Sequence, residues 1–421
     1  MITLAPLLWR CWSYQMHILF CHDTYYCKKR DGTVLSYASF PYSLWERRFL
    51  PYFESITVIG RKKKLRADET GVLEISSGRN VDHILLPNIH SPIKRLTKYR
   101  NMYKRIKEQV ERADAVIIRG PVEFGMMAAK AARKLGKPYA IDMCGCAYNK
   151  EYSKNNILSK LYAPIKFRRA QYMVKHASAV IYVTENFLQE RYPTQGISAY
   201  ASNVEIATPP EYVLNSRIER IKSNVGKFNI GLIGNFGSGL KGLDLALGAL
   251  GIVNKYRDEN PDKNLPDFCF KILGQGFAAQ WQGLIHSNDL DGKVEFCGTI
   301  ARGRDVLEWL DDIDIYLQPS LHEGLPRSLI EAMSRGCPAL ASDAGGAGEL
   351  LSDEFIHECG DTQKLADQII SLMNNERRLI AAQNNFEKAK NYTIEELIPR
   401  RRDFWEAFAS LAKERLKSAQ M

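Results

Sequence analysis

The 421-residue sequence contains no apolar run approaching the roughly 18 residues that a membrane-spanning helix needs. It also has no internal repeat of fixed period, no low-complexity tract and no Cys-x-x-Cys pair among its nine cysteines. Cys144-Gly145-Cys146 is the one close pair, and a single intervening residue is poor spacing for a zinc site. We therefore expect no metal site, no disulfide framework, and buried thiols in a reducing, cytoplasmic location.

A convincing signal peptide is also missing. The apolar opening MITLAPLLW is interrupted by Arg10, and neither a basic first segment nor a small-residue cleavage site is evident. The first strand-like run is His17–Cys21. We expect residues 1–15 to be a disordered extension, or Met16 to be the true start.

Acidic residues are scarce in the first half of the chain. Residues 1–200 hold 33 Lys and Arg against 16 Asp and Glu, a net charge of +17, whereas residues 201–421 hold 25 against 32, a net charge of −7. A basic half implies a polyanionic neighbour such as an anionic membrane surface, a phosphorylated lipid or nucleic acid. The alternative is a solvated basic face without a partner. No nucleic-acid-binding module is readable, so a peripheral position on the inner face of the cytoplasmic membrane is our expectation.

The composition is that of a globular protein, with 45% hydrophobic and 25% charged residues, and the length favours two domains. Short apolar runs alternate with helix-length segments such as Met126–Leu135 and Ser328–Arg335. Strand, helix and strand in succession predict parallel sheets covered on both faces. The predicted strands are His17–Cys21, Ile56–Gly60, His83–Pro87, Ala115–Arg119, Tyr139–Met143, Ala179–Val183, Asn229–Gly234, Cys269–Gly274, Val294–Cys297, Ile313–Leu317 and Pro338–Ser342.

These strands form two series, which predicts an α/β protein of two doubly wound, Rossmann-like domains. Pro209-Pro210 stops regular structure at the junction, so a hinge is expected over Ser202–Pro210. The predicted domains are residues 16–205 and 206–392. Residues 393–421 read as a long helix with an apolar face that must pack on another element.

A glycine-rich segment, GLIGNFGSGLKG at residues 231–242, follows a predicted strand and opens a helix. Glycines let a ligand approach the backbone, and a helix start attracts phosphate. Gly237, Gly239 and Gly242 also spell the dinucleotide fingerprint G-x-G-x-x-G, which requires an acidic residue at the end of the next strand. That strand ends LGQG without an acid, and Lys241 adds a cation. The segment therefore predicts a phosphate site rather than an NAD site.

The segment PSLHEGLPRSLIEAM at residues 319–333 carries two carboxylates, Glu323 and Glu331. Pro326 suits the first turn of a helix, which places Glu323 in the preceding loop and Glu331 inside the helix. Eight residues of helical rise separate the two by about 10 Å. They are thus suited to two parts of one ligand and unsuited to a tight acid/base dyad.

With these motifs, residues 231–351 resemble the GT-B glycosyltransferases of the family-4 type, the glycosyl transferases group 1. The family's E-x7-E motif corresponds to Glu323 and Glu331, its K-G element to Lys241-Gly242, and its G-G-x-x-E element to Gly345-Gly346-Ala347-Gly348-Glu349. In the first half, YVT at residues 182–184, RYP at 191–193 and SNV at 202–204 resemble a bacterial polysaccharide-synthesis branch. The resemblance implies the GT-B fold, with two domains facing a central cleft and a C-terminal helix packing across.

The resemblance also implies a reaction and roles for residues. Members retain the anomeric configuration, need no metal or other cofactor, and use a nucleotide-sugar as co-substrate with a glycan or polyprenyl-linked acceptor. Glu323 is expected to contact the donor sugar, Glu331 the ribose, and Lys241 the diphosphate. Further donor-site residues are expected in the loops after the strands: Gly234, Asn235, Gly237, Gly274, Leu325, Arg327 and Ser328.

Two positions depart from the family pattern. Asn235 stands where an Arg is common, six residues before Lys241, and Arg327 is a candidate replacement. A strand that often ends in His in the family here ends with Asp142. The acceptor-side candidates are Gly32, Arg119 and Asp142. Two other classes stay open: another enzyme on the same architecture, such as a sugar-nucleotide epimerase, and a non-catalytic binder of polyanions.

Overall fold

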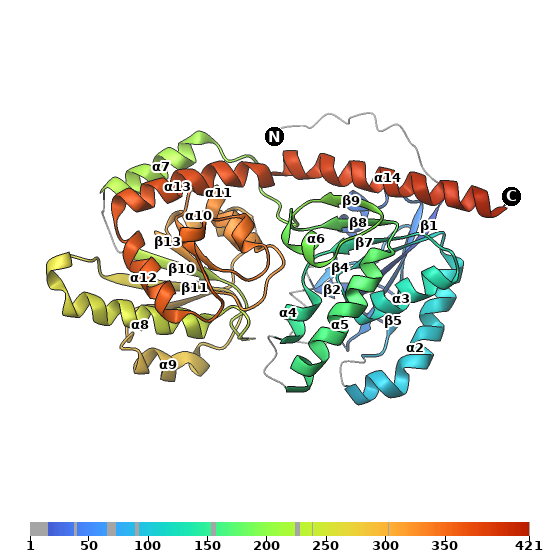
Figure 1. Cartoon of the computed structure of the whole chain (residues 1–421), viewed down its shortest axis with the longest axis horizontal. Helices are drawn as coiled ribbons and strands as arrows, with labels where there is room; N and C mark the ends of the chain where they lie inside the picture. Colours follow the sequence, from blue (N-terminus) through green and yellow to red (C-terminus); the bar gives the residue numbers. More distant parts are fainter. Residues whose placement is uncertain are drawn as a thin grey trace.

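The computed structural model describes residues 16–37, 40–64, 73–88, 92–152, 157–223, 228–237, 239–301 and 303–420. The expectation of a disordered extension over residues 1–15 falls outside these ranges. Two β-sheets, each flanked by helices, lie side by side along the long axis of the molecule (Figure 1). The predicted α/β fold with two sheet domains is confirmed.

Within the described residues the first sheet has nine strands. Its parallel strands run in the order β5-β3-β1-β6-β7-β8-β9, so the chain reverses direction across the sheet between β1 and β6. The strands are β1 His17–Lys28, β2 Val34–Tyr37, β3 Ser55–Lys62, β4 Leu73–Ile75, β5 Val81–Leu86, β6 Ala115–Arg119, β7 Tyr139–Met143, β8 Ala179–Tyr182 and β9 Ile197–Tyr200.

The second sheet has six described strands, all parallel, in the order β12-β11-β10-β13-β14-β15. Here the chain reverses between β10 and β13. The strands are β10 Phe228–Ile233, β11 Phe268–Leu273, β12 Val294–Gly298, β13 Ile315–Gln318, β14 Ala339–Ser342 and β15 Ile356–His357. Ligands of such sheets bind at the carboxyl ends of the strands beside the reversal.

Helices cover both sheets because each buries one apolar stripe. The first half contains α1 Tyr42–Arg48, α2 Pro92–Arg112, α3 Glu123–Lys134, α4 Ala147–Tyr152, α5 Ile157–Lys175 and α6 Phe187–Arg191. The second half contains α7 Glu211–Ser223, α8 Leu243–Glu259, α9 Gln282–Ser287, α10 Arg304–Asp311, α11 Arg327–Ser334, α12 Thr362–Leu372 and α13 Asn375–Ala389. No helix among the described residues combines the length and apolarity required to cross a bilayer.

One feature of the first sheet differs from the prediction. The sequence predicted parallel strands throughout, but β2 pairs antiparallel with the far end of β1 and β4 pairs antiparallel with β2. This is possible because β1 continues to Lys28, past a register shift between Cys21 and Tyr25. A turn at residues 29–33 then reverses the chain.

The chain crosses between the two halves twice. The first crossing includes the predicted hinge at Ser202–Pro210, and the second precedes α14, Ile394–Gln420. The two segments run in parallel, joined by a bridge between Ile206 and Thr393. Helix α14 then returns over the first sheet (Figure 1), where the Trp405 ring packs edge-on to Phe49 at 5.2 Å. The predicted C-terminal helix that packs across the molecule is confirmed.

Candidate functional site

The loops that follow β10 and β13 form the centre of the site. Both strands flank the point where the second sheet reverses, so their carboxyl ends open into one crevice. The loop after β10 leads to Lys241, and the loop after β13 carries Glu323. The Lys241 Nζ lies 2.6 Å from the Glu323 Oε1. The structure thus brings together the residues expected to contact the diphosphate and the donor sugar.

Gln318, the last residue of β13, holds Glu323 from its other side. Its Nε2 donates to the Glu323 Oε1 at 3.0 Å and to the Ser320 hydroxyl at 2.7 Å. Its Oε1 accepts from the Ser328 hydroxyl at 3.0 Å and the Tyr316 hydroxyl at 2.9 Å. Every polar atom of this buried amide is used, so the Glu323 carboxylate is pre-oriented. Gln318 was not among the predicted site residues, although a polar residue at the end of an apolar strand is a usable signal.

Two glycines allow the backbone of this loop to close around Lys241. A Cβ at Gly274, which has φ +144°, would lie 1.8 Å from the Gly234 carbonyl oxygen. A Cβ at Gly234 would meet the Lys241 side chain at 2.7 Å. The predicted donor-site residues Gly234 and Gly274 therefore shape the loop, because a side chain at Gly274 would clash with the backbone of Gly234 and one at Gly234 would clash with Lys241.

Helix α11 begins directly behind the Glu323 loop. Pro326 occupies its N-cap position, and the first helical residues are Arg327 and Ser328. A helix start carries unpaired N–H groups and partial positive charge, so it favours an anion in the crevice. The pairing of Ser328 with Gln318 ties this helix start to the Glu323 loop.

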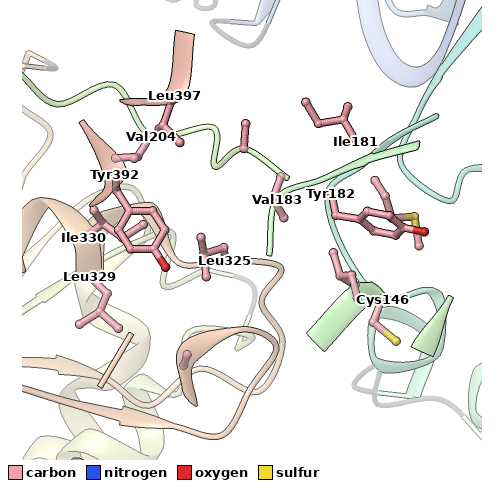
Figure 2. Packing of buried hydrophobic residues seen from close by; sticks show 14 of the residues in the cluster. Cys146, Ile181, Tyr182, Val183, Val204, Leu325, Leu329, Ile330, Tyr392 and Leu397 are labelled. Carbon is pink, nitrogen blue, oxygen red and sulfur yellow. The ribbon is translucent and has the colours of Figure 1, made fainter. Parts of the chain in front are cut away.

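A cavity of about 1080 Å³ lies between the two halves. Five predicted site residues are among those that line it: Arg119, Glu323, Leu325, Arg327 and Glu331. Both carboxylates of the E-x7-E pair therefore face one space, with Arg327 beside them. Leu325 also belongs to the buried apolar cluster at the junction, and Figure 2 shows it with Tyr392 and Val183, which come from different halves.

Other predicted residues lie elsewhere. The Asn235 Oδ1 accepts from the Gly237 N–H at 2.9 Å, so these two residues form a local turn after β10. Gly32 lies in the turn between β1 and β2 and has φ +92°. It is not among the described residues that line the cavity, and its local structure is that of a plain tight turn.

The face of the first half that lines the cavity is rich in arginine. The Arg119 Nη1 donates to the Asp142 Oδ2 at 2.8 Å, which joins the two acceptor-side candidates. Burial of the guanidinium lowers the pKa of Arg119, but Asp142 and Cys144 outweigh this effect and the pKa is raised. Arg48, at the end of α1, donates to the Asn203 Oδ1 at 2.8 Å and pairs with Glu205 at 2.9 Å.

A third arginine, Arg401 of α14, adds to this group. It donates to the Ser202 carbonyl oxygen at the first crossing. Burial, reinforced by the charges of Arg48 and Arg119, lowers the pKa of Arg401 to about 9. Arg48 and Arg401 were not predicted, because they come from helices far from Arg119 in the chain.

Glu349, which ends the G-G-x-x-E element, joins the two halves. Its carboxylate accepts from the backbone N–H groups of Glu185, Asn186 and Phe187 at 2.7, 3.0 and 2.6 Å, at the start of α6. A second close approach lies nearby, where a Cβ at Gly324 would meet the Cys144 carbonyl oxygen at 2.2 Å. The halves thus meet directly at the loop that carries Glu323.

The described residues contain no group of three or more His, Cys, Asp or Glu side chains arranged to hold a metal ion. The chemistry that this site offers comes from one ammonium group, two carboxylates, a guanidinium and a helix start. Together they can bind a phosphate-bearing ligand that also presents hydroxyl groups.

Comparison with known proteins agrees with this geometry. A family model described as Glycosyl transferases group 1 matches residues 227–375. Protein CapJ of Staphylococcus aureus is 27% identical over 390 residues, which cover 91% of this chain and 93% of CapJ. The Escherichia coli enzyme UDP-Gal:alpha-D-GlcNAc-diphosphoundecaprenol alpha-1,3-galactosyltransferase is 27% identical over 147 residues, 32% of this chain and 35% of that enzyme.

The fold has counterparts among solved structures. HepE of Anabaena in complex with UDP aligns with a TM-score of 0.61 at 17% identity, over 94% of this chain and 100% of HepE. The same protein in complex with UDP-glucose aligns with a TM-score of 0.57. The fold is that of the GT-B glycosyltransferases, and residues 227–375 match the glycosyl transferases group 1.

Proposed function

We propose that this chain is a glycosyltransferase that moves a sugar from a nucleotide-diphosphate sugar to a glycan or lipid-linked acceptor in the synthesis of a surface polysaccharide. In this proposal transfer retains the anomeric configuration and needs no metal ion. The observation that carries the proposal is the Lys241–Glu323 pair, set beside the start of α11 at a cavity between the two halves.

Lys241 can hold Glu323 and a diphosphate at the same time. An ammonium group has three N–H donors, and the Glu323 Oε1 accepts one of them. The other two are available to oxygens of the diphosphate, whose negative charge grows as the bond to the sugar breaks. The N–H groups at the start of α11 stabilise the same charge. These two sources of positive potential supply what a metal ion supplies in other transferases.

The remaining donor contacts follow from the cavity lining. Glu331, inside α11, is assigned to the ribose hydroxyls, and Glu323 to the sugar. Asn235 turns toward the backbone of its own loop, so it does not replace the Arg common in the family. Arg327 lines the cavity and is assigned the role of the second cation.

The acceptor is assigned to the opposite wall, where Arg119 and Asp142 form an ion pair and Arg48 lies beside them. Two comparisons support a nucleotide-sugar donor on one wall and a lipid-linked acceptor on the other. HepE was solved with UDP and with UDP-glucose, and the E. coli relative is named for a UDP-Gal donor and a diphosphoundecaprenol-linked acceptor. A uridine nucleotide is therefore the first donor to test.

A thermal-shift panel of nucleotide diphosphates and nucleotide-sugars, run with a chelator present, tests the proposal. A ligand that binds only the folded state raises the melting temperature as its concentration exceeds its dissociation constant. We expect at least one nucleotide-sugar to do so, and its sugar to appear on an added acceptor with the same anomeric configuration.

The same experiment separates the alternatives. An epimerase would convert the donor sugar without an acceptor. A non-catalytic polyanion binder would respond to heparin or nucleic acid and to no nucleotide-sugar. Either result would contradict the proposed transfer.

A further inference from the structure

Helix α5 exposes large apolar side chains on its outer face. Ile157, Leu158, Leu161 and Ile165 are 73, 61, 67 and 56% exposed, and Tyr172 near the helix end is 55% exposed. Leu158, Leu161, Ile165 and Tyr172 follow helical spacing and form one stripe, which we call the α5 stripe. The inner face, by contrast, buries small residues such as Ala163 and Ala170. A solvated helix normally carries polar residues outward, so this stripe is suited to a covering partner.

A cation-lined pocket of about 350 Å³ opens at the C-terminal end of the stripe. Its lining consists of Tyr99, Met126, Lys130, Arg133, Arg168, Arg169, Tyr172 and Met173, so it holds four cationic side chains and no carboxylate. Tyr172 belongs to both the pocket and the stripe.

Among the residues that the structure describes, one of these four cations is paired with a carboxylate. Arg169 is paired with Glu123 at 3.3 Å. Among the described residues no carboxylate forms an ion pair with Lys130, Arg133 or Arg168. The Arg133 guanidinium instead lies 4.8 Å from the centroid of the Tyr172 ring. An uncompensated group of cations with aromatic walls favours a phosphate-bearing ligand.

We propose that the α5 stripe and the adjacent cationic pocket together bind an anionic phospholipid bilayer. The pocket takes the phosphate of a headgroup, and the stripe enters the boundary between headgroups and acyl chains. Apolar burial and attraction to anionic lipid both contribute to this kind of interfacial binding. The net charge of +17 on residues 1–200 agrees in sign with an anionic surface.

Helix α4 connects this surface to the cavity between the two halves. Helix α4 begins immediately after the segment that contains Cys144, and Cys144 lines the cavity. Helices α4 and α5 pack together on the side of the first sheet that is nearer the second half (Figure 1). Binding through α5 would hold the cleft near the bilayer surface. Access to a lipid-linked acceptor as the benefit of this position rests on the proposed function. The binding of α5 to the bilayer does not depend on it.

Vesicle flotation of the full chain tests the proposal, with vesicles of phosphatidylcholine alone or mixed with phosphatidylglycerol. We expect binding to the anionic vesicles at low salt and little to the neutral ones. The pair Leu161→Glu and Ile165→Glu should abolish binding. The triple change Lys130→Gln, Arg133→Gln and Arg168→Gln should weaken it on the order of a hundredfold, since each cation near an anionic leaflet contributes about 1 kcal/mol.

Ile380→Glu is the matched control, because Ile380 is 54% exposed on α13, in the other half. It should bind vesicles like the wild type. Thermal melting of each variant checks folding, and nucleotide-sugar binding in solution should be unchanged, so a failure of docking is distinguishable from a failure of the proposed function. The proposal would be overturned if the wild type bound neutral and anionic vesicles equally. It would also be overturned if the Leu161→Glu and Ile165→Glu pair lost a dimer and kept vesicle binding.

Discussion

At the scale of single residues, the chemistry depends on how tightly Glu323 is positioned. Its Oε1 receives both the Lys241 ammonium group at 2.6 Å and the Gln318 amide at 3.0 Å. Its side chain is 13% exposed and that of Lys241 26% exposed, so solvent only partly screens the pair. A group held in this way needs no rearrangement when the donor binds.

Replacing Glu323 by Gln removes the charge but keeps the shape. We expect turnover of the nucleotide-sugar to fall by roughly 10²- to 10³-fold, the range found for loss of one preorganised polar group. Steady-state kinetics with the donor identified by the thermal-shift panel measure this. The melting temperature of the variant reports whether folding is intact, and turnover within twofold of the wild type would exclude the assigned role.

His83 is expected to make the stability of the folded protein depend on pH. Burial of the imidazole, with a smaller contribution from Lys28, lowers its pKa from 6.5 to about 4. Its Nε2 contacts the Ser76 hydroxyl at 3.0 Å, while its buried Nδ1 has no hydrogen-bond partner among the described residues. Protonation would therefore leave a buried N–H without an acceptor.

Because the folded-state pKa is the lower one, the contribution of His83 is fully present above pH 6.5 and is lost as the pH falls toward 4. The full shift corresponds to about 3 kcal/mol. We expect the melting temperature of the wild type to fall over this pH range more steeply than that of a His83→Gln variant. Parallel pH curves for the two proteins would show that this histidine is not responsible.

At the scale of elements, the contact between Glu349 and the start of α6 joins the two halves. Three backbone N–H groups converge on one carboxylate at 2.6–3.0 Å. Two of the three hydrogen bonds are exposed to solvent, which weakens each of them, but all three act on the same charged group. This contact therefore favours the observed arrangement, in which the two halves touch at this point.

Changing Glu349 to Ala should shift the molecule toward an open arrangement. We expect a larger radius of gyration by small-angle scattering at saturating nucleotide, and a higher KM for the donor. Glu349→Gln, which keeps one acceptor oxygen, should lie between the wild type and the Ala variant. An Ala variant with unchanged radius and KM would mean that the Glu349 contact does not govern closure.

The sequence predicted some elements well and others poorly, for physical reasons. The bounds of β6 and β7 agree with the prediction because both strands are buried on two faces and form short continuous apolar runs. Strands β2, β4, β9 and β15 have two to four residues each and were missed. Strands β8, β13 and β14 also have four residues but were predicted, because they are buried throughout, whereas β4, β9 and β15 are partly exposed and lack a continuous apolar run.

The residues of the candidate site also divide into those that a local pattern predicts and those that it does not. Lys241, Glu323 and Glu331 were predicted because they belong to short motifs with fixed spacing. Gln318 was missed because its function comes from its contacts with Glu323 and Ser328. Arg48 pairs with Glu205, 157 residues further along the chain, and no local pattern indicates such a contact.

At the scale of the whole molecule, the two sheets present complementary walls. The second half supplies the carboxylates, the lysine and the helix start, and the first half supplies arginines to the opposite wall of the cavity. Two adjacent crossings and α14 connect the halves, so a small rotation at Ile206 and Thr393 can open or close the cleft while each sheet stays intact. The domain boundaries at residues 205 and 392 remain a prediction.

The central claim is that a nucleotide diphosphate binds in the second half through Lys241 and the start of α11 without a metal ion. Isothermal titration of UDP into the wild type and into Lys241→Met, each with and without EDTA, tests it most directly. We predict that EDTA leaves the affinity of the wild type unchanged and that the Met variant binds at least roughly tenfold more weakly, as loss of a charge-assisted hydrogen bond requires. Binding that disappears with EDTA, or that is equal in the two proteins, would contradict the account.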